Sequence, residues 1–355
     1  MKRLLIWYWS ATGGGGSQYA VNLAHRLSRR FGAGAIRLSL HANDPLLARA
    51  RGFAFETRAA EVSTNRHKPL STLLALGDSA GVLEEAARDC DAVLLPMNFA
   101  SAAPLALGLN KPLVYFAHDP APHPGDYAAL GQRATQALLT ACAVRVVAMS
   151  EYAARELERC GVTRRKIIIA PLSAVFAPRT ASFQNDGPKH LLFAGRMMAY
   201  KGIDLLADAL PLIDARADWR VTIAGEGPTL DDAMRARLCD ERVEVRPGWM
   251  SEAALEDLIA VCDILLAPYR SATQSGVVAQ ALALGRPCVV TPVGALPEQI
   301  GSGRAGWIMT NVCAQSLAST LSEITASTWR EKLQAAVSMS AQSWGHDYWG
   351  WLDEV

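Results

Sequence analysis

Short apolar runs alternate along the chain with longer stretches in which hydrophobic residues recur every three or four positions. Runs of strand length occur at 4–9, 91–96, 112–117, 144–149 and 166–170. A second series occurs at 189–194, 219–225, 243–247, 263–267 and 288–291. The spacing between the runs indicates amphipathic helices. Strands that alternate with helices form parallel sheets covered by helices, so the pattern predicts an α/β fold.

The two series of strands predict two domains. The chain has 355 residues, which is more than one ordinary domain contains. Between the two series, the segment 173–188 is rich in Pro, Ser, Thr and Asn and has no periodicity, so we interpret it as a linker. The first domain then spans 1–172 and the second spans 189–339.

Charge is divided unevenly between the two halves. Residues 1–170 carry 20 Lys and Arg against 13 Asp and Glu, a net +7. Residues 171–355 carry 15 against 21, a net −6, so the whole chain has a net charge of only +1. A basic first half favours contact with an anionic surface or acceptor. The alternative is a set of scattered arginines that are simply solvated.

Cysteines and the N-terminus bear on location. The seven cysteines include no Cys-x-x-Cys pair, which is typical of reduced thiols in a cytoplasmic protein. The first ten residues are too short an apolar run for a signal peptide and lead directly into a glycine loop. No uninterrupted apolar run has the length of a membrane span. We expect a cytoplasmic protein whose contact with the membrane face, if any, is peripheral.

A glycine-rich loop follows the first strand. Gly14, Gly15 and Gly16 lead into a segment with helical spacing, and Ser17 is expected to cap that helix. Glycines let a backbone approach an anion closely, and a helix N-terminus attracts phosphate. The loop lacks the Lys-Ser/Thr of a P-loop and the spacing of a dinucleotide-binding fingerprint. A tight turn without a ligand is the alternative interpretation.

Two histidines and an aspartate follow the strand at 112–117. His118, Asp119 and His123 belong to a loop that three prolines stiffen. Ligands of open α/β sheets gather at the carboxyl ends of strands, so these side chains are candidates for a polar site. A structural histidine at a strand end is the alternative.

The second domain contains two further candidate sites. The strand at 189–194 is followed by Gly-Arg, four residues, Lys-Gly and an amphipathic helix. The polar segment 271–275 precedes a buried, alanine-rich helix whose first N–H groups lack partners within the helix. Such an end attracts phosphate.

These motifs resemble the family-4 retaining glycosyltransferases, which have the two-domain GT-B fold. The similarity spans nearly the whole chain and is strongest over 189–298. Matching positions of the signature region are Ala281, Gly285, Pro287, Val289, Val290, Gly294, Pro297 and Glu298. The Glu-x7-Glu pair of the family is missing, because Ala272 and Gln280 stand at its positions. Gln274-Ser275-Gly276 is similar to a Gln-Ser-Gly subgroup of the same family.

The resemblance implies two doubly wound, Rossmann-like domains that face each other across a cleft. A C-terminal helix at about 340–355 would pack back on the first domain. The implied reaction moves a sugar from a nucleotide-sugar, expected to be a UDP- or GDP-sugar, to a hydroxyl of a saccharide or lipid-linked saccharide. The anomeric configuration would be retained, and no metal or cofactor would be needed. Polysaccharide or cell-surface glycan biosynthesis would be the setting, with no nucleic-acid partner.

The resemblance also assigns roles to residues. Arg196 and Lys201 would neutralise the departing diphosphate, and His118 would contact the donor sugar or handle the acceptor proton. Asp119 and His123 are acceptor-side candidates. The implied donor-binding residues are Gly14, Gly15, Gly16, Gly195, Gly225, Glu226, Gly248, Gln274, Ser275, Gly276 and Val277.

Other functional classes stay open at this point. A non-catalytic subunit that binds a nucleotide-sugar would account for the missing glutamates. A GT-B-fold nucleotide-sugar epimerase would need acid–base carboxylates in the cleft. A nicotinamide-dependent oxidoreductase would need the glycine fingerprint and its acidic partner, which the sequence lacks.

Overall fold

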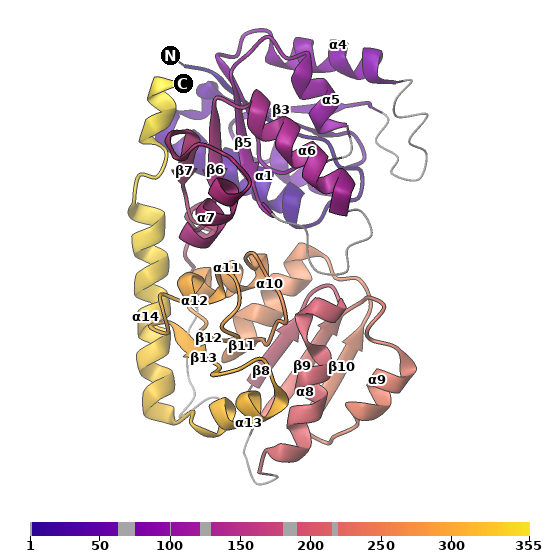
Figure 1. Ribbon diagram of the computed structural model, residues 1–355, viewed down its shortest axis with the longest axis vertical. Helices are drawn as coiled ribbons and strands as arrows, with labels where there is room; N and C mark the ends of the chain where they lie inside the picture. The colour runs from indigo at the N-terminus through magenta and orange to yellow at the C-terminus, as the bar shows by residue number, and fades with distance from the viewer. Residues whose placement is uncertain (1, 63–74, 100, 121–128, 180–189, 215–218) are drawn as a thin grey trace. The chain divides into compact units, whose positions relative to one another are not determined.

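The computed structural model describes residues 2–62, 75–99, 101–120, 129–179, 190–214 and 219–355 (Figure 1). The chain divides into two compact units. Unit 1 contains the residues up to Ala170 together with Asp347–Val355, and unit 2 contains Pro171–His346. Each unit is built around its own parallel sheet, which confirms the prediction of two Rossmann-like α/β domains.

Unit 1 has a seven-stranded sheet in the order β3-β2-β1-β4-β5-β6-β7. Its strands are β1 (Leu4–Tyr8), β2 (Ile36–His41), β3 (Glu56–Ala60), β4 (Ala92–Leu95), β5 (Leu113–Ala117), β6 (Arg145–Ala148) and β7 (Ile167–Ile169). Its described helices are α1 (Gly15–Phe31), α2 (Leu47–Arg51), α4 (Leu76–Ala87), α5 (Ala102–Leu107), α6 (Ala129–Cys142) and α7 (Glu151–Arg159). The strand order reverses between β1 and β4, which makes that pair the topological switch point.

Unit 2 repeats this plan with six strands in the order β10-β9-β8-β11-β12-β13. They are β8 (His190–Ala194), β9 (Arg220–Gly225), β10 (Val243–Pro247), β11 (Ile264–Ala267), β12 (Cys288–Val290) and β13 (Gly306–Ile308). The helices are α8 (Ile203–Ala209), α9 (Asp232–Arg237), α10 (Glu252–Val261), α11 (Gly276–Ala283), α12 (Leu296–Gln299), α13 (Ala314–Ser322) and α14 (Ala326–Gly345). The order reverses between β8 and β11.

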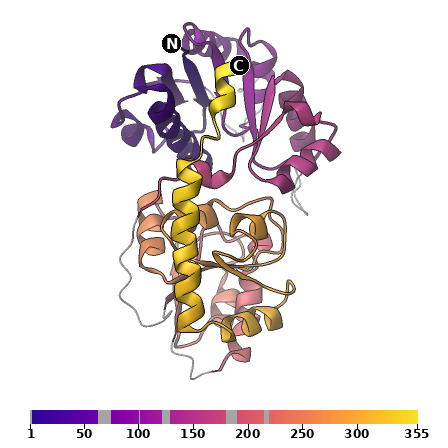
Figure 2. The same cartoon turned by 90° about the vertical axis from the view of Figure 1, so that its left-hand side faces the viewer.

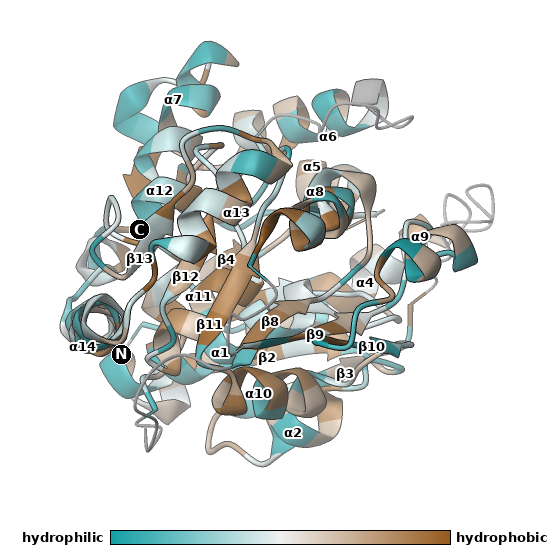
Figure 3. Ribbon diagram, turned by 90° about the horizontal axis from the view of Figure 1, so that it is seen from below, coloured by the Kyte–Doolittle hydropathy of each residue, from teal (hydrophilic) through white to brown (hydrophobic). Residues whose placement is uncertain are grey.

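Burial of both sheet faces explains why the strands are continuous apolar runs. In β8, Leu191 and Phe193 pack into one core cluster, whereas Leu192 and Ala194 pack into another on the opposite face. The hydropathy colouring shows the contrast between a buried strand and an amphipathic helix, since β11 is brown and α7 is mostly teal (Figure 3). Among the described helices, none combines the length and apolar character needed to cross a bilayer.

The described part of the predicted linker belongs to unit 2, and the predicted C-terminal helix is divided between the two units. Leu172–Val175 forms a 3-10 turn, η3, that packs against α11 and α14, so 173–179 belongs to unit 2. Helix α14 runs along one side of the same unit (Figure 2). Residues 340–346 therefore lie in unit 2, and only the last nine residues, Asp347–Val355, belong to unit 1.

The C-terminal segment is anchored in unit 1 by both apolar and polar contacts. Trp349 is fully buried, with its ring 6.2 Å from that of Phe116 in β5. Arg30 of α1 forms ion pairs with Asp347 and Asp353 at 2.9 and 3.0 Å. The two chain ends consequently lie close together (Figure 1).

Candidate functional site

The switch point of unit 2 brings two loops together. Gly195 and Arg196 follow β8, and Tyr269 follows β11, its neighbour in the sheet. In this fold class, a crevice opens where the connections of two adjacent strands leave toward opposite faces of the sheet. It lies at the carboxyl ends of the two strands, and ligands bind there. We therefore expect the donor-binding residues that the resemblance implies to lie at this crevice.

Backbone hydrogen bonds made by glycines link the carboxyl ends of β8, β9 and β10. Gly195 has φ +112° and donates its N–H to the Ala224 carbonyl at 3.0 Å. Gly248 in turn donates to the Gly225 carbonyl at 3.1 Å. A Cβ at Gly225 would overlap the Gly195 carbonyl, so glycine is required there by the fold itself. The Glu226 carbonyl accepts a hydrogen bond from Met197 N–H at 2.7 Å, and the Glu226 side chain is exposed.

Lys201 has a buried ammonium group. The residue is 7% exposed, and its Nζ donates to Tyr269 Oη at 3.2 Å. The same Nζ lies 5.0 Å from the centre of the Tyr269 ring. A Cβ at Gly195 would lie 2.8 Å from Nζ, so the ammonium is directly beside that glycine. Lys201 has no ion pair with any carboxylate of the described residues.

Arg196 has the opposite character, since its side chain is exposed and has no hydrogen-bond or ion-pair partner within the described part of the chain. Arg196 directly follows Gly195 and therefore belongs to the same loop after β8. An exposed guanidinium can form paired hydrogen bonds with a phosphate.

The N-terminus of α11 lies beside the loop that follows β8. Ser275 is its N-cap and accepts a hydrogen bond from Val278 N–H at 3.3 Å. Gln299 fixes the Ser275 backbone by two hydrogen bonds, at 2.8 Å to its N–H and 3.1 Å to its carbonyl. A Cβ at Gly195 would be 3.6 Å from Val277, so this helix end lies beside the β8 loop. Gln274, just before the cap, is half-buried.

Gly276 is the first residue of α11, and the fold does not require a glycine there. Its φ is not positive, and a Cβ would meet nothing within 4 Å. Glycine in a helix costs roughly 0.5–1 kcal/mol relative to alanine. Its absent side chain instead leaves the first N–H groups of the helix open to an approaching anion.

The positions of the missing signature glutamates are both buried. Ala272 is 7% exposed and Gln280 is 5% exposed. Ala272 presents its carbonyl to Gly294, whose φ of +53° allows that close approach. Neither position supplies a carboxylate to the crevice, while Glu298 on α12 is exposed.

The glycine loop of unit 1 opens α1 in a different way from the one the sequence suggested. Gly14 has φ +94° and is the N-cap, so Ser17 is not the cap. Ser17 is instead buried inside the first turn and donates its hydroxyl to Asp44 Oδ2 at 2.5 Å. A Cβ at Gly16 would collide with Tyr8 Oη, whereas Gly15 has open space around it.

His118 follows β5 and is held by its surroundings in the neutral form. Burial lowers its pKa from 6.5 to about 4, against the opposing effects of the Asp119 charge and a hydrogen bond with the Pro96 carbonyl. Its ring meets that of Tyr19 edge to face at 4.8 Å. Asp119 itself is exposed. His123 lies outside the described residues.

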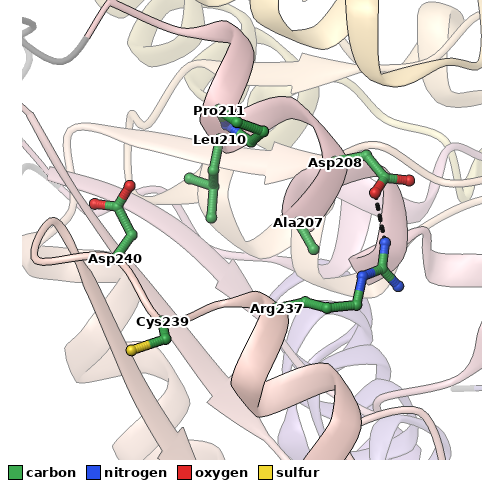
Figure 4. Close-up of a pocket in the computed structure, with 7 residues that line it drawn as sticks. All are labelled: Ala207, Asp208, Leu210, Pro211, Arg237, Cys239 and Asp240. Atoms are coloured by element: carbon green, nitrogen blue, oxygen red, sulfur yellow. Dashed lines mark hydrogen bonds and ion pairs between the residues drawn. The ribbon is translucent and has the colours of Figure 1, made fainter.

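A separate hollow of about 320 Å³ lies at the opposite edge of the unit 2 sheet. Its walls come from residues that precede β9 and β10, including Leu210 and Asp240 (Figure 4). Asp208 and Arg237 form an ion pair across it at 2.6 Å. Because this is the amino edge of the strands, the hollow is distinct from the crevice.

The sequence motifs missed Tyr269 and Gln299, which hold Lys201 and the start of α11. A tyrosine two residues after a buried strand was the available signal for the first. No group of three or more His, Cys, Asp or Glu in the described ranges is arranged to hold a metal ion.

Comparison with protein families gives a match in each half of the chain. Residues 13–172 match the model described as Glycosyltransferase Family 4. Residues 188–327 match the model described as Glycosyl transferases group 1.

Curated proteins show partial similarity. A D-inositol 3-phosphate glycosyltransferase of Pseudarthrobacter chlorophenolicus is 30% identical over 184 residues, which is 47% of this chain and 44% of that protein. A GDP-mannose-dependent alpha-(1-6)-phosphatidylinositol dimannoside mannosyltransferase of Mycobacterium tuberculosis is 33% identical over 170 residues, 44% of this chain and 42% of that protein. The matched region thus spans less than half the length of these relatives.

Solved structures share the fold at low sequence identity. Anabaena HepE in complex with UDP and glucose has a TM-score of 0.73 and 16% identity, covering 97% of this chain and 96% of that chain. Sucrose-phosphate synthase from Thermosynechococcus elongatus has a TM-score of 0.73 and 15% identity, covering 97% and 95%.

Proposed function

We propose that this chain is a family-4 glycosyltransferase of GT-B fold and that it transfers a sugar from a nucleotide-sugar to an acceptor hydroxyl. Glycosyltransferase models that match each half of the chain support the proposal. The observation that carries the proposal is the buried Lys201 ammonium beside Gly195. A buried cation without a carboxylate is costly, and an anionic ligand would compensate it.

The chemistry of the departing group fits this arrangement. A nucleoside diphosphate gains negative charge as the bond to the sugar breaks, and Arg196, Lys201 and the N-terminus of α11 are all positive or hydrogen-bond donating. Donors directed at developing charge are worth roughly 3–4 kcal/mol each in the transition state. Such electrostatic stabilisation makes a metal-independent reaction our expectation.

We further propose that the anomeric configuration is retained. The family resemblance is the support for retention, with the departing phosphate oxygen taking the acceptor proton on the same face. His118, neutral at pH 7, would contribute a hydrogen bond to the donor sugar or the acceptor rather than a positive charge.

A saccharide or lipid-linked acceptor in cell-surface glycan synthesis is the proposed second substrate. One similar protein carries a phosphatidylinositol dimannoside mannosyltransferase name, and residues 1–170 of this chain have a net charge of +7. Peripheral contact with an anionic membrane face would follow from that charge.

The test is calorimetric titration with UDP, GDP, ADP and NAD, followed by assay of sugar release from UDP-glucose and GDP-mannose. We expect micromolar binding of one nucleoside diphosphate and slow hydrolysis of its sugar. If NAD alone binds, or none of the four, the proposal is wrong. A non-catalytic donor-binding subunit, which the absent carboxylates at Ala272 and Gln280 favour, would bind the nucleotide without releasing sugar from any donor.

A further inference from the structure

We propose that Tyr269 is a positioning residue, whose phenol holds the Lys201 ammonium at the crevice and links it to the start of α11. The proposal rests on the proposed function in one respect, namely that Lys201 meets the diphosphate. The sequence motifs assign no role to this tyrosine.

The contacts of the phenol run in two directions. Tyr269 is 3% exposed, and its Oη accepts a hydrogen bond from Lys201 Nζ at 3.2 Å. The same oxygen lies 3.3 Å from Ser275 Oγ, which also accepts from Val278 N–H. Either of the two hydroxyl groups can be the donor in the Tyr269–Ser275 hydrogen bond. The phenol thereby connects the cation to the N-cap of the helix.

The tyrosine ring restricts Lys201 further. Nζ lies 5.0 Å from the ring centre, where the negative face of the π-system attracts a cation. Lysine has a long, flexible stem, so an ammonium fixed at one end loses less freedom when a ligand binds. The other hydrogens of the ammonium group can then be donated to an anion.

A neutral partner has an electrostatic advantage over a carboxylate. A carboxylate at the same distance would cancel the charge of Lys201, whereas a phenol fixes the ammonium and leaves its full charge for the ligand. The first signature position cannot supply a carboxylate, since it is Ala272. Tyr269 therefore orients the cation without neutralising it.

The first experiment is a double-mutant cycle with Tyr269→Phe and Lys201→Met. Affinity for UDP and GDP is measured by calorimetry on the full chain. Tyr269→Phe should weaken the tighter nucleotide about tenfold, the scale of a hydrogen bond to a charged group. In the Lys201→Met background the same change should alter affinity less than about twofold, because a residue that acts through Lys201 has nothing left to position.

The matched control is Tyr115→Phe. Tyr115 is a buried phenol of unit 1, 2% exposed, that donates to Gln136 Oε1 at 2.7 Å. Its loss should affect stability but leave nucleotide affinity unchanged. An unchanged affinity in Tyr269→Phe, with wild-type binding intact, would overturn the proposal, as would an equal loss in both backgrounds.

A second readout needs no nucleotide. Competitive acetylation followed by peptide mass spectrometry reports how accessible the Lys201 amine is in the unliganded protein. We expect several-fold more labelling of Lys201 in Tyr269→Phe than in the wild type. Equal labelling would overturn the positioning role, even if neither UDP nor GDP binds and the proposed function itself has failed.

Discussion

At the scale of single residues, the crevice combines two cations of different character. Lys201 is buried and oriented, whereas Arg196 is exposed and can adapt to a ligand. A fixed ammonium and an exposed guanidinium would suit the diphosphate of the proposed donor, whose charge shifts toward the leaving oxygen during the reaction. His118 is a third special residue, because its surroundings oppose its charged form.

Removing either cation tests the diphosphate assignment. Arg196→Ala or Lys201→Ala should lower turnover about 100- to 1,000-fold while the fold stays intact by circular dichroism. Arg235→Ala is the control, since Arg235 is an exposed arginine of α9 paired with Asp232 at 3.7 Å, and should leave turnover unchanged. Near-normal turnover in either cation variant would contradict the assignment.

Titration of His118 should appear in the stability of the protein. Its pKa falls from 6.5 to about 4 on folding, so the unfolded chain binds a proton that the folded chain does not. Stability is then fully present above pH 6.5 and is lost as pH falls from about 6.5 toward 4. Urea unfolding at pH 7 and pH 5 should show a larger acid loss for the wild type than for His118→Gln. The same loss in both would show that His118 does not titrate in this way.

At the scale of elements, α1 and α11, which follow β1 and β11, have different requirements at their first residues. Gly14 needs a positive φ at the cap of α1, and Gly16 is fixed by the side chain of Tyr8. Gly276 of α11 has no positive φ, and a Cβ there would meet no side chain within 4 Å. A glycine that the fold does not need points to a ligand that approaches the helix end.

Gly276→Ala should therefore separate stability from binding. The variant should gain up to about 1 kcal/mol in free energy of unfolding, because alanine is the better helix former. UDP or GDP affinity should fall, since the new methyl group stands at the helix N-terminus. Gly81→Ala in α4, another exposed glycine with open space around it, should give a similar stability gain without a binding change. Wild-type affinity in Gly276→Ala would show that no ligand needs this glycine.

At the scale of the whole molecule, the chain returns to its first unit to complete it. The last nine residues, Asp347–Val355, supply a buried tryptophan and two ion-pair partners to a core that otherwise ends at Ala170. Trp349 is fully buried, so we interpret this aromatic residue as packing rather than as part of a membrane-facing patch.

Trp349→Ala should destabilise unit 1 by about 3–5 kcal/mol, the usual cost of emptying a buried aromatic site. Trp249→Ala is the matched control, because Trp249 is 64% exposed and its loss should change the free energy of unfolding by less than about 0.5 kcal/mol. Urea unfolding followed by circular dichroism measures both. Equal small effects would mean that the C-terminal segment contributes little to unit 1.

The sequence by itself determined the α/β class, the positions of the strands other than β2, β3 and β13, and the loops at 13–16 and 195–202. These features depend on signals within a few residues of each other, such as hydrophobic period, helix caps and glycine turns. Ser150, Ser251 and Ser275 precede their helices in the sequence and cap them in the structure.

Only the tertiary structure decided which side chains meet. Lys201 and Tyr269 are 68 residues apart, and they touch because β8 and β11 are neighbours at the switch point. Ser17 pairs with Asp44 instead of capping α1, and Trp349 joins a core that begins more than 340 residues earlier in the chain. Strand order fixes these contacts, and no local periodicity encodes it.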